Sequence, residues 1–152
     1  MNRKELITEL KKFFDIRELV CPHTFAAFGE RSWQFFDKDA LELLLVLRRD
    51  IVKAPMLINN WHTGGKFSQR GFRCNICQLV KDKTLKGKIY LTSHANGAAF
   101  DFDAAGMTSE EVRKLVESKK DLLPCNVRME DAVSWCHIDI YDSGLKFSRF
   151  AA

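Results

Sequence analysis

Long apolar runs, repeats and low-complexity tracts are absent from this chain of 152 residues. The most apolar stretch, residues 40–47, ends at charged side chains and falls well short of the roughly 18 residues that a membrane-spanning helix needs. Without repeats or a disordered tail, solenoid and fibrous architectures are excluded. The length therefore predicts one domain of ordinary size, and we expect no membrane span.

Cysteines are few and odd in number. They are Cys21, Cys74, Cys77, Cys125 and Cys136. An odd set without a secretory signal argues against a disulfide framework. Cys74 and Cys77 form one C-x-x-C motif, but no second such pair exists, and Cys21 with His23 lies far upstream. We therefore interpret the thiols as buried or incidental, in preference to a zinc ribbon.

Neither sign of charge dominates, since 24 basic and 20 acidic residues leave a formal net charge of +4. The basic residues are scattered except in residues 81–88, which we interpret as a solvated loop. Without a clustered basic face or a nucleic-acid-binding motif, we expect no nucleic-acid partner. The charge also fits an anionic cell wall.

The apolar pattern predicts helices mostly first and strands mostly last. The expected helices cover residues 3–14, 37–52 and 108–120, and the expected strands cover residues 56–60, 98–103, 125–130, 134–141 and 145–150. Residues 61–73, with three glycines, read as a functional loop. This order predicts an α+β fold in a single domain, with a central antiparallel sheet flanked by helices.

An acid stands between two phenylalanines in one of these strands. Strand alternation sends Phe100 and Phe102 to the core and Asp101 to the opposite face. In residues 134–141 the same alternation places His137 and Asp139 together, away from the apolar face. If the two strands are neighbours, Asp101 lies level with His137.

His94, on the loop before the first of these strands, can fold back towards Asp101 through Gly97. Two imidazoles and one carboxylate then make a three-ligand zinc site with an open fourth position. Zinc lowers the pKa of a water in that position to about 7, which is the chemistry of a hydrolase. The alternative is an exposed strand face that carries an ordinary histidine and aspartate.

The same residues resemble the zinc D-Ala-D-Ala carboxypeptidase family. Its motif S-x-H-x-x-G-x-A-x-D matches Thr92-x-His94-x-x-Gly97-x-Ala99-x-Asp101, with threonine in place of the first serine. Its downstream W-x-H motif resembles Trp135-x-His137, and an upstream segment ending in arginine resembles residues 71–73. The resemblance covers about residues 40–142, after an N-terminal helical extension of residues 1–38.

The resemblance implies a hedgehog-like fold and zinc bound by His94, Asp101 and His137. It implies that Arg73 binds a substrate carboxylate or polarises the scissile carbonyl. The implied activity is hydrolysis of peptidoglycan stem peptides, as a carboxypeptidase or a cell-wall endopeptidase. Residues 1–12 do not look like a signal peptide, so we expect a cytoplasmic monomer that reaches the wall by phage-type release, as an endolysin does.

This sequence departs from the family pattern at the position of the general base. Many family members carry a glutamate three residues before the last zinc histidine, and Ser134 stands there in this chain. Asp139 or Glu130 is the expected substitute, and Asp139 alternatively orients a zinc histidine. The alternative function is a zinc-binding module of the same fold, which binds cell wall or a protein partner with little or no hydrolysis.

Overall fold

A five-stranded sheet lies at the centre of the computed structural model, which describes residues 1–152. Its spatial order is β1-β2-β4-β3-β5. The strands are β1 (Met56–Leu57), β2 (Ala99–Ala104), β3 (Val127–Glu130), β4 (Cys136–Asp139) and β5 (Phe147–Phe150). The pairs β1–β2, β2–β4 and β4–β3 are antiparallel, whereas β3 and β5 are parallel.

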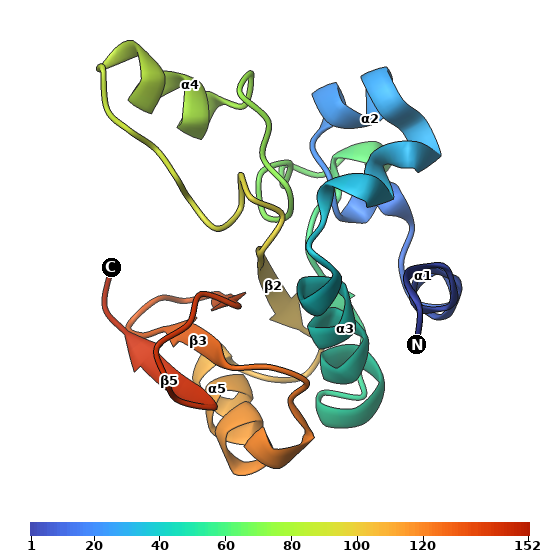
Figure 1. Cartoon of the computed structure of the whole chain (residues 1–152), viewed down its shortest axis with the longest axis vertical. Coiled ribbons are helices and arrows are strands. Elements are labelled where there is room, and N and C mark those ends of the chain that lie inside the picture. Colours follow the sequence, from blue (N-terminus) through green and yellow to red (C-terminus); the bar gives the residue numbers. More distant parts are fainter.

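Helices form the N-terminal part of the molecule and flank the sheet (Figure 1). The α-helices are α1 (Arg3–Leu10), α2 (Pro22–Phe28), α3 (Lys38–Val46), α4 (Gln78–Leu85) and α5 (Ser109–Ser118). Shorter helical turns are η1 (Ile16–Glu18), η2 (Gly29–Phe35), η4 (Trp61–Thr63) and η5 (Lys120–Leu122), and the π-helical η3 (Leu47–Ile51) continues α3. None of these helices has both the length and the apolar character of a membrane span.

Local capping explains where two of the expected helices begin. The Thr108 hydroxyl accepts a hydrogen bond from the Glu111 amide at 3.2 Å, and the Glu111 carboxylate accepts one from the Thr108 amide at 2.7 Å. This capping box starts α5, as the sequence predicts. At α3, the Asp37 carboxylate accepts a hydrogen bond from the Asp39 amide at 2.8 Å.

One apolar core unites the helices with the sheet. It contains 28 buried residues, among them Leu6 of α1, Leu44 of α3, Phe100 of β2 and Ile138 of β4. The rings of Phe36 and Phe100 stack with centroids 5.6 Å apart. Residues 1–38, expected as a helical extension, thus supply part of the core, and the predicted single α+β domain is confirmed.

Three local expectations are wrong. The sheet is mixed because the chain leaves β4 and crosses to the far edge of β3, so that β5 enters parallel to β3. Residues 22–35, which lie outside the helices and strands expected from the sequence, form α2 and η2. Residues 81–85, expected in a solvated loop, belong to α4. Val80 is the only buried residue of this helix, so its sequence shows almost no helical periodicity of buried apolar residues.

Substitution of Gly97 would test how tightly the loop before β2 packs. Its φ is +66°, and a Cβ there would lie 2.0 Å from the Phe35 carbonyl oxygen. We expect Gly97→Ala to lower the free energy of unfolding by about 3 kcal/mol or more, because backbone must move. Gly87→Ala has the same φ and open space around it, so only about 1–2 kcal/mol of strain is expected. Equal losses in urea unfolding would contradict the close contact.

Candidate metal centre

Strand register brings Asp101 and His137 together. β2 and β4 are antiparallel neighbours in which Asp101 lies opposite His137 and Phe100 lies opposite Ile138. Phe100 and Phe102 are fully buried in the core, so Asp101 points to the other face, as alternation predicts. The sheet thus places one imidazole and one carboxylate side by side on the face away from the core.

His94 completes the group from the loop before β2. Its Nε2 lies 3.3 Å from His137 Nδ1 and 3.2 Å from Asp101 Oδ1, and His137 Nδ1 lies 2.7 Å from Asp101 Oδ1. Metal bonds of about 2.0–2.1 Å at tetrahedral angles separate nitrogen and oxygen donors by about 3.3–3.4 Å. Two of the three separations agree with this spacing, and the third, between His137 Nδ1 and Asp101 Oδ1, is that of a hydrogen bond. The three buried side chains therefore form a possible metal site.

The second nitrogen of each imidazole is held by another group. His94 Nδ1 lies 2.9 Å from the Gly71 carbonyl oxygen, which can only accept, so this nitrogen carries the proton. His137 Nε2 lies 3.0 Å from Asp139 Oδ2 and donates to it. Both contacts direct the remaining nitrogens, His94 Nε2 and His137 Nδ1, towards Asp101, which is the arrangement of metal-binding histidines.

Burial and hydrogen bonds shift the pKa values of all three side chains in the group. Burial raises the pKa of the Asp101 carboxyl, but the interactions with His137 and His94 outweigh it and hold that pKa below its usual range. Burial lowers the pKa of His94. It also lowers that of His137, but hydrogen bonds to Asp101 and Asp139 prevail and raise the pKa to about 9. A proton on His137 thus balances the carboxylates where no metal does.

Both carboxylate oxygens of Asp139 are occupied by hydrogen bonds, one of them from His137. It is 1% exposed, and Arg128 donates to both of its oxygens at 3.0 and 2.9 Å. The Tyr141 amide donates to Oδ1 at 3.1 Å, and Ser93 Oγ lies 3.5 Å from Oδ2. A carboxylate with these partners suits the orienting role that the sequence left open, and has little capacity to accept a proton from water.

Glu130 lies on the other side of His137. β3 pairs with β4 through Arg128 opposite Asp139 and Met129 opposite Ile138. The same register, continued by one residue, brings Glu130 next to His137. Directly opposed residues share a face of the sheet, with Cβ atoms about 4.5–5.5 Å apart. Glu130 is half-buried and lines the same cavity as His94, Asp101 and His137.

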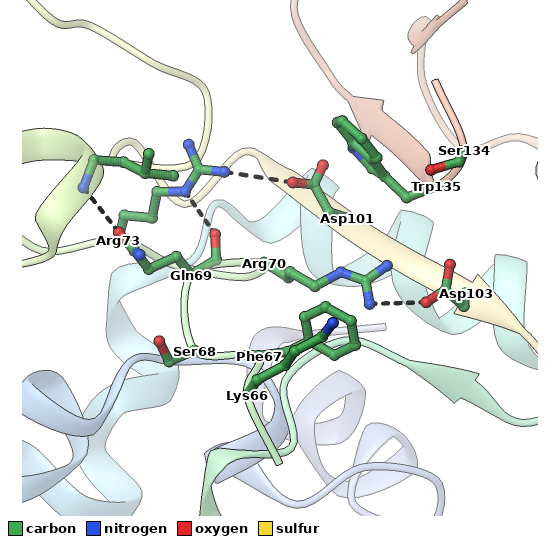
Figure 2. Close-up of a pocket in the computed structure, with 11 residues that line it drawn as sticks. Lys66, Phe67, Ser68, Gln69, Arg70, Arg73, Asp101, Asp103, Ser134 and Trp135 are labelled. Atoms are coloured by element: carbon green, nitrogen blue, oxygen red, sulfur yellow. Dashed lines mark hydrogen bonds and ion pairs between the residues drawn. The ribbon is translucent and has the colours of Figure 1, made fainter. Parts of the chain in front are cut away.

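Two adjoining cavities open onto the centre, with volumes of about 470 and 590 Å³. Both are lined by Arg73, Asp101 and Trp135. Figure 2 shows the larger one, with Arg73 between Gln69 and Asp101. Arg73 Nη2 lies 3.4 Å from Asp101 Oδ2, and Nε donates to the Gln69 carbonyl at 2.6 Å. Ser134 lines only this larger cavity, is exposed, and offers no carboxylate.

A second group of possible ligands was missed by the interpretation of the cysteines as incidental. Cys21, His23, Cys74 and Cys77 place their ligand atoms within 4.8 Å of one another. The sequence carries them as two short pairs, C-x-H and C-x-x-C, far apart in the chain. Only the tertiary structure joins these pairs, so spacing alone could not have identified the group.

No family model, curated protein or solved structure matches this chain. The arguments for its function therefore rest on the geometry of its own residues and on the motifs they form.

We expect His94→Ala and His137→Ala each to remove one equivalent of metal per chain, because two of three ligands cannot hold the ion tightly. The measurement is elemental analysis of protein loaded with zinc and desalted. His62→Ala is the matched control, since that ring packs on Trp61 outside both ligand groups. Wild-type metal content in both ligand variants would refute the ligand set.

Proposed function

We propose that this chain is a zinc-dependent peptidase of the D-Ala-D-Ala carboxypeptidase type, acting on peptidoglycan stem peptides. The observation that carries the proposal is the convergence of His94, Asp101 and His137 on one point at the wall of a cleft. The same cleft holds Arg73 and Glu130, which supply the two further functions that peptide hydrolysis needs. The motifs around these residues indicate the class of substrate.

Zinc suits this donor set. Two imidazole nitrogens and one carboxylate oxygen are borderline-soft and hard ligands, and three protein ligands leave the fourth tetrahedral position to water or substrate. When bound, zinc supplies a Lewis acid that polarises a peptide carbonyl and makes an attacking water more acidic. The cavities beside the three ligands provide the space from which a peptide would approach.

Arg73 fits the role of a substrate anchor. Its side chain is only 10% exposed, and Gln69 and Tyr90 hold it through Nε and Nη1. The permanently charged, planar guanidinium beside Asp101 can bind the carboxylate of a peptide terminus or the oxygen of a scissile carbonyl. Partial burial strengthens either contact, because few waters compete with it.

Glu130 is our candidate for the general base. It faces the cavity next to His137, whereas Asp139 is bound by Arg128 and His137. A carboxylate in this position would take a proton from the attacking water and pass it to the leaving amine. Glu130 thus replaces, from a neighbouring strand, the acid that Ser134 does not supply.

The direct test is digestion of purified peptidoglycan, followed by mass spectrometry of the products. Release of a terminal D-alanine identifies a carboxypeptidase, and cut stem peptides or cross-bridges identify an endopeptidase. A chelator should abolish the release, and added zinc should restore it. Stoichiometric zinc with no product from any cell-wall fragment would refute peptidase activity and leave a binding module.

Substitution of the two carboxylates should separate their roles. We expect Glu130→Gln to lower kcat about 10²–10⁴-fold with metal content unchanged, because a proton acceptor is lost. We expect Asp139→Asn to weaken metal affinity about 10–100-fold in competition with a chromophoric chelator. Glu42→Gln, on the surface of α3, controls for lost charge. Normal turnover in Glu130→Gln, with loss of turnover but not of metal in Asp139→Asn, would reverse the assignment.

A further inference from the structure

We propose that Cys21, His23, Cys74 and Cys77 form a second metal site, structural in role and selective for zinc or another thiolate-preferring cation. This site is separate from the three-ligand centre and independent of the proposed peptidase activity. Its four ligand atoms lie within 4.8 Å of one another, and Cys21 and Cys77 are buried. Four protein ligands complete a tetrahedron without an open position, as in structural zinc sites.

A short backbone pairing brings the two halves of the group together. Val20 and Phe72 form a parallel bridge, and the Phe72 amide donates to the Leu19 carbonyl at 2.8 Å. Because the two segments run in the same direction, Cys21 and Cys74, which follow them, lie at the same end of the bridge. Backbone contacts that need no metal therefore bring the two pairs, which are distant in the sequence, close together in space.

The three distances among Cys74, Cys77 and His23 match the edges of a tetrahedral site. Cys74 Sγ lies 3.9 Å from Cys77 Sγ, and His23 Nδ1 lies 3.6 and 3.9 Å from these two sulfurs. Bonds of about 2.3 Å to sulfur and 2.0–2.1 Å to nitrogen give edges of about 3.8 Å between sulfurs and 3.6 Å between sulfur and nitrogen. A disulfide would instead need about 2.05 Å between sulfurs.

Hydrogen-bonding groups lie against two of the ligand sulfurs, and such contacts favour the thiolate form that binds metal. Cys21 Sγ lies 3.1 Å from the Thr24 hydroxyl. The Ile76 amide donates to Cys74 Sγ at 3.4 Å, which places a second donor against a ligand sulfur.

The site lies where the fold has little else to hold it. α4 belongs to residues 74–91, which project from the rest of the molecule and are called the arm below (Figure 1). The apolar cluster beneath the arm contains only Cys21, Cys77 and Val80 as buried members, with Cys74 and Tyr90 packed against it. The arm leaves large apolar side chains exposed, namely Ile76, Leu79, Leu85, Ile89 and Leu91. A metal would supply the cross-link that so small a cluster lacks.

The same cross-link would position Arg73. Cys74 follows Arg73 directly in the chain, and Tyr90 of the arm lies 3.3 Å from Arg73 Nη1. The Leu79 amide at the start of α4 donates to Gln69 Oε1 at 3.0 Å, and Gln69 in turn accepts from Arg73. Fixing the arm therefore fixes the guanidinium beside the three-ligand centre.

Metal counting separates the two sites. Zinc-loaded wild type should hold two equivalents, one for each ligand group. Cys74→Ser and Cys77→Ser should each lose one equivalent and keep the other. Cys125→Ser is the matched control, because that half-buried cysteine lies outside the group and should not change the count. Full metal content in both group variants would overturn the proposal.

Cobalt substitution includes a test on the wild type, whose result does not depend on variants that can misfold. The wild type and His94→Ala should both show the near-ultraviolet charge-transfer band of thiolate-bound cobalt, and Cys77→Ser should lack it. Absence of this band from wild-type protein that has been kept reduced and loaded with cobalt would overturn the second site. That result leaves the three-ligand centre untouched, so the two proposals fail separately.

Limited proteolysis tests the structural role. Chelation of the wild type should speed tryptic cleavage within residues 81–88 by more than about tenfold, because opening of the arm limits cleavage. His94→Ala loaded with zinc should be cut there at the wild-type rate. Unchanged cleavage of the arm after complete metal removal would show that the metal does not hold it.

Discussion

The buried carboxylate of Asp101 is the constraint on which the rest of the site depends. It lies in a strand between two fully buried phenylalanines, and only 10% of its side chain is exposed. A carboxylate so removed from water must be balanced by positive charge and hydrogen-bond donors. His137 and Arg73 meet this need from a neighbouring strand and a loop.

The sheet arranges these groups in two rows. In one row Asp101 lies opposite His137 across β2 and β4, and Glu130 of β3 lines the same cavity. In the next row Asp139 and Arg128 are paired, and Asp139 accepts a hydrogen bond from the second ring nitrogen of His137. The first row presents ligands and a free carboxylate to the cleft, whereas the second holds the imidazole in place. Because both rows belong to a hydrogen-bonded sheet, their spacing is set by backbone geometry.

The two ligand groups differ in chemistry and are joined by one segment of chain. The three-ligand centre is open towards two cavities, which suits a reacting metal. The cysteine-rich group offers four ligands, which would leave no coordination position of a tetrahedral ion open and so suits a structural metal. Arg73 lies between them, in contact with Asp101 on one side and bonded to Cys74 on the other. In the proposed function, rigidity at one group thus serves binding at the other.

The sequence by itself determined the features that depend on neighbours along the chain. Capping starts α5, and alternation directs Asp101 and His137 away from the core, because these effects act within a few residues. The tertiary structure alone decided which strands became neighbours and in what register. It therefore placed Glu130 next to His137, made β5 parallel to β3, and joined Cys21 and His23 to the C-x-x-C motif. Those outcomes depend on long-range pairing and packing, which residue spacing along a chain does not specify.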